Sequence, residues 1–152
     1  MGSEMCIRDS LITGLGKGFA IAQGRLGPGR IHHCMRTIGL AEKALELAIK
    51  RGIERVAFGS PIIKLGGNGE RIAKARMAID QARLMTLHAA WKIDAVGVKN
   101  AMTEISAIKV VVPNMAQEIV DMAVQMHGGA GCLLYTSPSP RDLSTSRMPS
   151  SA

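Results

Sequence analysis

The sequence is poor in aromatic residues, which limits the kind of core it can build. Only four aromatic side chains occur among 152 residues, namely Phe19, Phe58, Trp91 and Tyr135. Apolar residues nevertheless make up 47% of the chain, including ten methionines. That fraction is enough to form the core of one domain, and the core that it predicts is aliphatic.

The sequence pattern also lacks a membrane-spanning segment and a secretory signal. No apolar run approaches the roughly 20 residues that a transmembrane helix needs, and no apolar segment precedes Gly14 as a signal peptide would require. The three cysteines are odd in number and lack metal-ligand spacing. We therefore expect a chain without a membrane span in a reducing intracellular compartment, which is the cytoplasm if the source is bacterial.

Metal-ligating and catalytic constellations are missing as well. His32, His33 and Cys34 adjoin one another, but consecutive helical residues point about 100° apart and cannot converge on one ion. No nucleophile, base and orienting group share a recognisable spacing. The stretch GLGKG at 14–18 lacks the third glycine of a dinucleotide fingerprint, so it predicts an entry loop. We expect neither a metal site nor a catalytic residue in this chain.

The net charge of +7 arises from 19 Lys and Arg against 12 Asp and Glu. The excess falls within residues 14–131, since the two flanks together hold equal numbers of each sign. A basic fold favours anionic partners. Nucleic acid is disfavoured, because unpaired bases stack on aromatic side chains and this chain has almost none. A nucleotide-like small molecule fits the composition better.

Composition divides the chain into three parts. Residues 1–13 show no useful hydrophobic periodicity, and residues 133–152 are mostly Ser, Pro and Thr. Such segments bury too little apolar area to offset the entropy of ordering. We therefore expect both ends to be disordered and to lie outside the domain's own sequence. Residues 14–132 hold the periodic segments that predict a helical domain.

Two long stretches in the first two thirds of the chain repeat apolar residues with the period of an α-helix. The first follows a Gly/Pro-rich loop at 24–30 and runs over residues 31–55. Its expected apolar face consists of Ile31, Met35, Ile38, Leu45, Ile49, Ile53 and Val56. The second runs over residues 70–96, where Leu84 and Trp91 widen the apolar face, as expected of a helix contacted from two directions.

The third predicted helix has the most regular pattern. It begins after Asn100, a candidate N-cap, and stops at Gly128. The pattern passes unbroken through Pro113, which predicts one kinked helix rather than two. No segment alternates as a strand would. The expected fold is therefore all-α, an up-down bundle of three long helices.

Two of these helices end in motifs that suit a large phosphate-bearing ligand. RVAFG closes the first at 55–59, and QMHGGAG closes the third at 125–131. Each joins a polar side chain, Arg55 or Gln125, to backbone left open at a helix end. Both also have structural interpretations: arginine complements the helix dipole, Phe58 could plug the bundle end, and glycine commonly caps helices. The residues alone leave both interpretations open.

The sequence around the two motifs resembles the C-terminal helical domain of acyl-CoA dehydrogenases. The similarity is carried by GKGFAIAQGRLGPGRIHHCMRTIGLAEKALELAIKRGIERVAFGSP and TEISAIKVVVPNMAQEIVDMAVQMHGGAG. It covers residues 14–131 and points to the branch that includes the acyl-CoA dehydrogenases fused to kinase-like domains, with their bacterial relatives. The ordered pair RxxFG and QxxGGxG at this separation makes the resemblance specific.

The resemblance implies an FAD-dependent enzyme that removes the α and β hydrogens of an acyl-CoA thioester. It implies electron transfer to an electron-transfer flavoprotein and a homo-oligomer of two or four subunits. It also implies that three helices of a four-helix bundle are present here. In the family, the motifs of one subunit reach the FAD held mainly by its neighbour.

The resemblance also assigns residues to sites. The implied FAD-contacting residues come from the two motifs and are Arg55, Val56, Ala57, Phe58, Gln125, Met126, His127, Gly128 and Gly129. The first motif would meet the pyrophosphate, and the second would line the cofactor further along through Gln125 and its backbone. A guanidinium can bind phosphate through a two-pronged fork, and glycine permits close backbone approach. Arg30 corresponds to the family's arginine near the acyl thioester.

The sequence departs from the family pattern at several positions. Gly29 stands where some branches place the catalytic glutamate, and the last helices of the family, which carry it in most branches, do not follow residue 131. We therefore expect this chain alone to be inactive. Leu65 and Gly66 occupy positions where relatives often place polar cofactor contacts. The alternative function is a non-catalytic helical bundle that mediates protein association.

Overall fold

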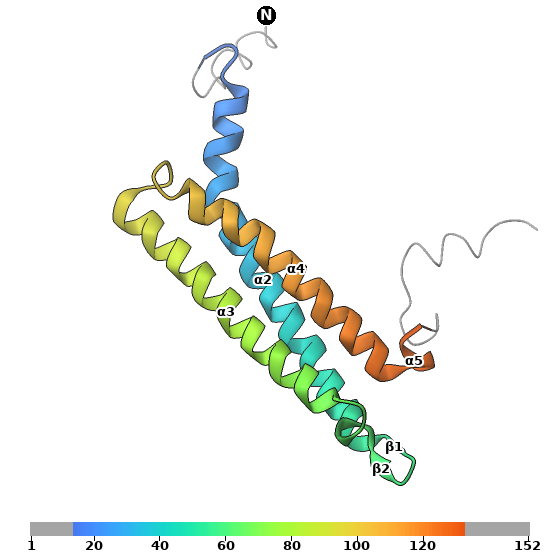
Figure 1. The fold of residues 1–152 in the computed structure, drawn as a ribbon. Coiled ribbons are helices and arrows are strands. Elements are labelled where there is room, and N and C mark those ends of the chain that lie inside the picture. Colours follow the sequence, from blue (N-terminus) through green and yellow to red (C-terminus); the bar gives the residue numbers. More distant parts are fainter. Residues whose placement is uncertain (1–13, 133–152) are drawn as a thin grey trace, which may run out of the picture.

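A computed structural model describes residues 14–132, which form an elongated three-helix bundle with a small hairpin at one end (Figure 1). Helix α2 (Gly18–Glu54) runs the length of the bundle, α3 (Asn68–Val96) returns beside it, and α4 (Met102–His127) runs parallel to α2. The short helix α5 (Gly129–Cys132) follows α4. The predicted helical class and up-down order are confirmed.

A short hairpin joins α2 to α3, and the sequence analysis missed it. Strand β1 (Val56–Ala57) pairs antiparallel with β2 (Ser60–Pro61), and the 3₁₀-helix η1 (Ile62–Lys64) leads into α3. Strands of two residues are too short to show the alternation that reveals a strand. The predictions for residues 1–13 and 133–152 concern segments outside the described residues.

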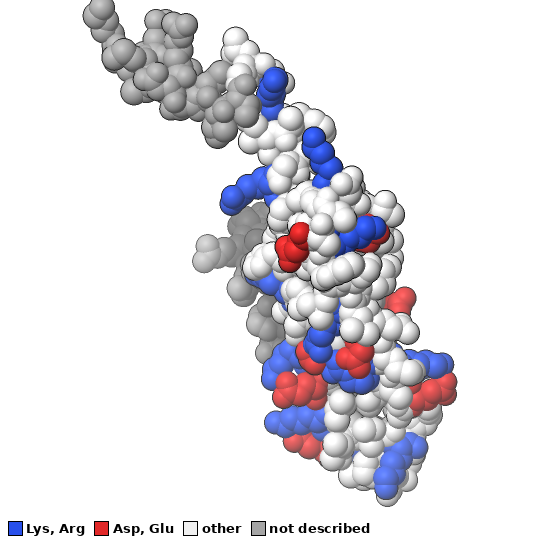
Figure 2. Space-filling view, turned by 90° about the vertical axis from the view of Figure 1, so that its left-hand side faces the viewer, with Lys and Arg blue, Asp and Glu red and all other residues white. Residues whose placement is uncertain are grey.

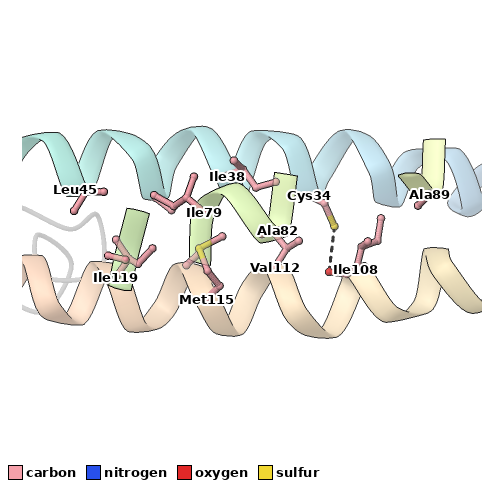
Figure 3. Packing of buried hydrophobic residues seen from close by; sticks show 13 residues of the cluster. Cys34, Ile38, Leu45, Ile79, Ala82, Ala89, Ile108, Val112, Met115 and Ile119 are labelled. Atoms are coloured by element: carbon pink, nitrogen blue, oxygen red, sulfur yellow. Dashed lines mark hydrogen bonds between the residues drawn. The ribbon is translucent and has the colours of Figure 1, made fainter. Parts of the chain in front are cut away.

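The core is aliphatic, as the composition predicts, and each helix contributes residues in steps of three and four (Figure 3). The Cys34 thiol of α2 donates a weak hydrogen bond to the Ile108 carbonyl of α4 at 3.6 Å, and burial raises the pKa of this thiol. The largest fully buried side chains are Ile38, Ile79, Ile105, Ile108, Val112 and Thr86. The regular apolar period predicted for the third helix is confirmed, since Ile105, Ile108 and Ile119 are all buried.

The face predicted for the first helix is only partly right. Ile38 and Leu45 are buried, but Ile53 is 58% exposed. The true core face of α2 passes through small residues such as Ala41 and Ala48. Small side chains let helices pack closely, yet they carry a weak hydrophobic signal, so the larger exposed residues distorted the predicted face.

Helix α2 begins 13 residues earlier than residue 31, where the prediction placed its start. The predicted loop at 24–30 is wrong, because this segment is helical despite Pro28. Gly27 is buried there, and a Cβ added to it would lie 2.9 Å from Val98 Cγ1 in the connection between α3 and α4. This long-range contact outweighs the local tendency of glycine and proline to break a helix. Only residues 14–17 of the predicted entry loop remain outside the helix.

Helix α4 is a single helix through Pro113, as predicted, and it ends at Gly128 with a φ of 62°. Its expected N-cap is wrong. The N-cap position is Ala101, without a side-chain cap, and the Asn100 amide instead donates to the Val96 carbonyl at 2.9 Å. The Asn100 side chain therefore closes the end of α3 rather than the start of α4.

Ion pairs tie α2 to α3 at the bundle surface. The Glu42 carboxylate accepts hydrogen bonds from Arg76 at 2.9 Å and from Arg83 at 2.5 Å. Arg76 also pairs with Asp80 at 2.6 Å. The Arg76 and Arg83 guanidinium groups lower the pKa of the Glu42 carboxyl. Figure 2 shows acidic and basic side chains interleaved over the lower half of the bundle.

The core assignment predicts different effects for two leucines of α2. Leu45 is 3% exposed, whereas Leu40 is 69% exposed. Leu45→Ala should lower the free energy of unfolding by about 2–5 kcal/mol, because it leaves a cavity. Leu40→Ala should change it by no more than about 0.5 kcal/mol. Urea denaturation followed by circular dichroism measures both, and equal losses would contradict the assigned core face.

The ion pairs predict that acid weakens the fold through Glu42. Its folded-state pKa lies below its ordinary value of 4.5, so the stabilisation is present above pH 4.5 and is lost as the pH falls through the folded-state pKa. Glu42→Gln should therefore reduce the difference in melting temperature between about pH 7 and about pH 3. Glu118→Gln is the control, since Glu118 forms no ion pair with a described residue. A similar reduction in both variants would argue against this role.

Candidate functional site

The two helix-end motifs lie at the same end of the bundle, although 70 residues separate Arg55 from Gln125. Because α2 and α4 run parallel, both finish near the hairpin (Figure 1). A Cβ added to Gly52 would lie 2.9 Å from Met126 Cε and 3.2 Å from Ile63 Cβ. Glycine at position 52 therefore leaves room for both α4 and η1. No periodic or compositional signal in the sequence marks this residue.

Phe58 sits at the tip of the hairpin in a backbone conformation that bulky residues rarely adopt. The strand register leaves a two-residue loop, Phe58–Gly59, with φ angles of 51° and 76°. Positive φ at both positions fits a type I′ turn. Gly59 adopts it freely, but left-handed backbone costs Phe58 about 1–2 kcal/mol. Within residues 14–132 no other non-glycine residue has a positive φ.

The Phe58 ring is almost wholly solvent-exposed. Its exposed fraction is 99%, and the neighbouring Val56 is 57% exposed, so burial within the described chain does not offset the strain. The interpretation of Phe58 as a plug for the bundle end is therefore wrong. Exposed apolar groups held by a strained backbone are found where proteins bind ligands or partners.

Arg55 caps the end of α2 through its backbone and leaves its side chain free. Its N–H donates to the Arg51 carbonyl at 3.0 Å, and its carbonyl accepts the Ile62 N–H at 2.9 Å. The side chain is exposed, and no carboxylate of the described residues lies within 4.0 Å of its guanidinium. The five guanidinium N–H donors of Arg55 are thus open to an external anion.

Arg51, one helical turn before Arg55, holds a buried polar atom that lacks a partner. Its Nε is buried and finds no acceptor among the described residues. A buried donor left unpaired costs about 1–3 kcal/mol, so a rearrangement of the Arg51 side chain that gives Nε an acceptor would relieve that cost. Two guanidinium groups at the end of α2 suit phosphate oxygens. The donor set therefore fits the pyrophosphate of FAD, and Arg51 is a candidate that the motif pattern of the sequence did not reveal.

The end of α4 presents accessible backbone groups to a ligand, and not charged side chains. Gln125 is exposed, and its carbonyl accepts the Gly128 N–H at 3.1 Å. A Cβ built on Gly128 or Gly129 would meet nothing within 4 Å, so a ligand can approach the backbone at both positions. The absence of side chains here leaves the turn accessible from outside the bundle.

Two residues of the second motif have side chains engaged within the chain. Met126 is 8% exposed and fills the space beside Gly52, so its side chain is not available to a ligand. The His127 ring donates from Nδ1 to the Ala123 carbonyl at 2.8 Å, which directs the ring back along α4.

Arg30 does not join the other predicted site residues. It lies 25 residues before Arg55 on the same helix, which at 1.5 Å per residue places the two roughly 38 Å apart. Arg30 is half-buried near the start of the bundle. The structure thus separates the residue implied for acyl-CoA from the residues implied for FAD.

Two further features of the described residues concern possible metal ligands and a groove beside the second motif. Across residues 14–132, no three His, Cys, Asp or Glu side chains group as a metal site would require. A groove of about 490 Å³ between α3 and α4 reaches Gln125 and carries Arg71 and Lys74 beside Glu118 and Asp121. Among the described helices, none is long and apolar enough to cross a membrane.

Comparison with known proteins identifies the domain. The family model described as "Acyl-CoA dehydrogenase, C-terminal domain" matches residues 16–149. The mouse protein "Acyl-CoA dehydrogenase family member 10" is 50% identical over 124 residues, covering 82% of this chain and 12% of its own. The Mycobacterium tuberculosis "Probable acyl-CoA dehydrogenase FadE2" is 53% identical over 116 residues, covering 76% of this chain and 28% of its own.

A solved structure shows the same fold. The "putative acyl-CoA dehydrogenase from Mycobacterium abscessus" superimposes with a TM-score of 0.77 and 63% sequence identity, covering 81% of this chain and 30% of that one. The chain therefore spans less than a third of each of these relatives. The sequence identity to these relatives, the matched family model and the shared helical fold all indicate the same family. The chain belongs to the acyl-CoA dehydrogenase family and carries the family's C-terminal helical domain.

Proposed function

We propose that this chain supplies part of the FAD site of an acyl-CoA dehydrogenase and does not act alone. The observation that supports this most directly is that the two motifs lie at one end of the bundle, where the Arg55 guanidinium pairs with no carboxylate of the described residues. An end with exposed cationic and backbone donors suits an anionic cofactor that another domain or subunit also holds.

In this proposal the residues of the hairpin and of the α4 terminus contact different parts of FAD. Arg55 and Arg51 donate to the pyrophosphate, while Val56, Ala57 and Phe58 present an apolar surface to the cofactor. Gln125 and the backbone at Gly128–Gly129 line it further along. FAD, when bound, accepts the β hydrogen of the acyl group as hydride. The chain's own residues hold and orient the cofactor and do not move a proton.

The parent reaction is the α,β-dehydrogenation of an acyl-CoA thioester to an enoyl-CoA. Arg30, roughly 38 Å from Arg55 along α2, lies near the thioester in this proposal, and its charge attracts the anionic substrate. Gly29 leaves no carboxylate beside it, so another segment provides the base. We further propose an intracellular homo-oligomer that delivers electrons to an electron-transfer flavoprotein.

Arg55→Ala tests the pyrophosphate contact. The chain is mixed with a fragment carrying the N-terminal and β-domains of a relative, and flavin absorbance is titrated. Loss of a charge-assisted hydrogen bond worth about 1.5–3 kcal/mol should raise the dissociation constant of FAD about ten- to hundredfold. Arg36→Ala on the same helix is the control, since Arg36 is exposed and lies outside the motif. Equal affinities for the two variants would remove Arg55 from the site.

Gln125→Ala should weaken FAD binding less, because a neutral hydrogen bond is worth about 0.5–1.5 kcal/mol. The expected rise in the dissociation constant is about two- to tenfold. Gln117→Ala provides the matched control, since Gln117 is an exposed glutamine of α4 two turns before the motif. The same titration measures both, and a larger effect at Gln117 would place the ligand elsewhere on α4.

The second candidate function is protein association through the outer face of α3. Leu84, Leu87 and Trp91 are 67%, 51% and 63% exposed, so this face lacks the second contact that the sequence analysis expected, within the described chain. An uncovered apolar stripe favours association. If the mixture stays colourless and acyl-CoA bleaches no flavin signal, the FAD proposal fails and association remains.

A further inference from the structure

The start of α3 is tied to the hairpin by a side chain to which the proposed function gives no role. Asn68, the first residue of α3, donates from Nδ2 to the Ile62 carbonyl at 2.8 Å. The Ile62 N–H in turn donates to the Arg55 carbonyl at 2.9 Å. We propose that Asn68 is a positioning residue, which holds the hairpin carrying Arg55 and Phe58 through the backbone of Ile62. That this restraint serves FAD binding rests on the proposed function. That Asn68 restrains the hairpin rests only on the hydrogen bonds described above.

The hairpin has few other restraints. Its ladder contains two residue pairs, and an isolated two-stranded hairpin is marginally stable in water. Its tip buries almost nothing, since Phe58 is 99% exposed. A left-handed phenylalanine persists only where the surroundings over-determine its conformation. The restraint comes from η1, which packs on α2 beside Gly52 and bonds to Asn68.

The loop before α3 explains why an asparagine performs this task. Gly66 and Gly67 adopt φ angles of 55° and 75°, and the N-cap Gly67 has no side chain with which to cap the helix. The Ile62 carbonyl already accepts the Leu65 N–H at 3.1 Å, and its second lone pair receives the Asn68 amide. Aspartate has the same shape as asparagine but lacks the N–H donor when ionised.

Fluorine NMR tests this role, because the chain contains only two phenylalanines, Phe19 and Phe58. In the full chain labelled with 4-fluorophenylalanine, Asn68→Ala should shift or narrow the Phe58 resonance and leave the Phe19 resonance unchanged. Hydrogen exchange of the Ile62 amide should accelerate roughly fivefold, the worth of one hydrogen bond. Asn68→Asp should do the same, although an acid in the first turn favours the helix.

Asn100→Ala is the matched control. Asn100 makes the same kind of bond, from Nδ2 to the Val96 carbonyl at 2.9 Å, at the opposite end of α3. This variant should leave both the Phe58 resonance and the Ile62 exchange rate unchanged. Unchanged signals in both Asn68 variants, or equal changes in Asn100→Ala, would overturn the positioning role. A general loss of stability is thereby separated from release of the hairpin.

Titration of FAD into the complemented mixture distinguishes this role from the proposed function. If both hold, Asn68→Ala weakens FAD binding roughly fivefold, and Asn100→Ala leaves it unchanged. If no variant binds FAD while the Phe58 resonance still moves, the proposed function fails and the positioning of the hairpin stands. If Asn68→Ala binds FAD as the unaltered chain does while the Phe58 resonance moves, the hairpin position does not matter for the cofactor, and the purpose assigned to this restraint is overturned.

Discussion

Close packing between α2 and α4 is the constraint on which the rest of the structure depends. Ala48 and Ala123 are buried where the two helices meet, and Gly52 leaves the space that Met126 fills. Small residues allow two helix backbones to approach, and the side chains at the contact set the distance between the axes. Because these helices run in the same direction, their C-termini arrive together. Each is followed by a glycine-containing turn at the same end of the bundle.

Local pattern was sufficient for much of the fold and insufficient at particular places. The apolar period and the capping glycine located α4 within two residues at its start and identified its last turn, because the core side chains of this helix are large. The start of α2 was misplaced because the contact between Gly27 and Val98 joins segments 71 residues apart. The hairpin was missed because its strands are two residues long. Contacts between distant segments leave no periodic trace in the sequence.

The candidate site divides in the same way. Arg55 and Gln125 were identifiable because polar side chains at helix ends carry a local signal, and the family resemblance gave them a ligand. Three other residues could not be identified from local signals. Gly52 matters because of a close approach between segments, Arg51 because of a buried atom without a partner, and Asn68 because of a hydrogen bond across a loop. The turn signal at Phe58–Gly59 was available in retrospect, because glycine at the second position of a two-residue loop is typical of type I′ turns.

The left-handed backbone of Phe58 lowers the stability of the fold, while it holds an aromatic ring exposed for binding. Asparagine or glycine at this position would relieve the strain, since both adopt positive φ more readily, and neither would lose buried area, because the ring is exposed. A population of variants selected only for thermal resistance should therefore discard this phenylalanine early, as often happens where function requires a strained residue. Retention of the aromatic ring under such selection would indicate that something outside the described residues rests against it. Selection experiments on position 58 can thus show whether another surface contacts the hairpin tip.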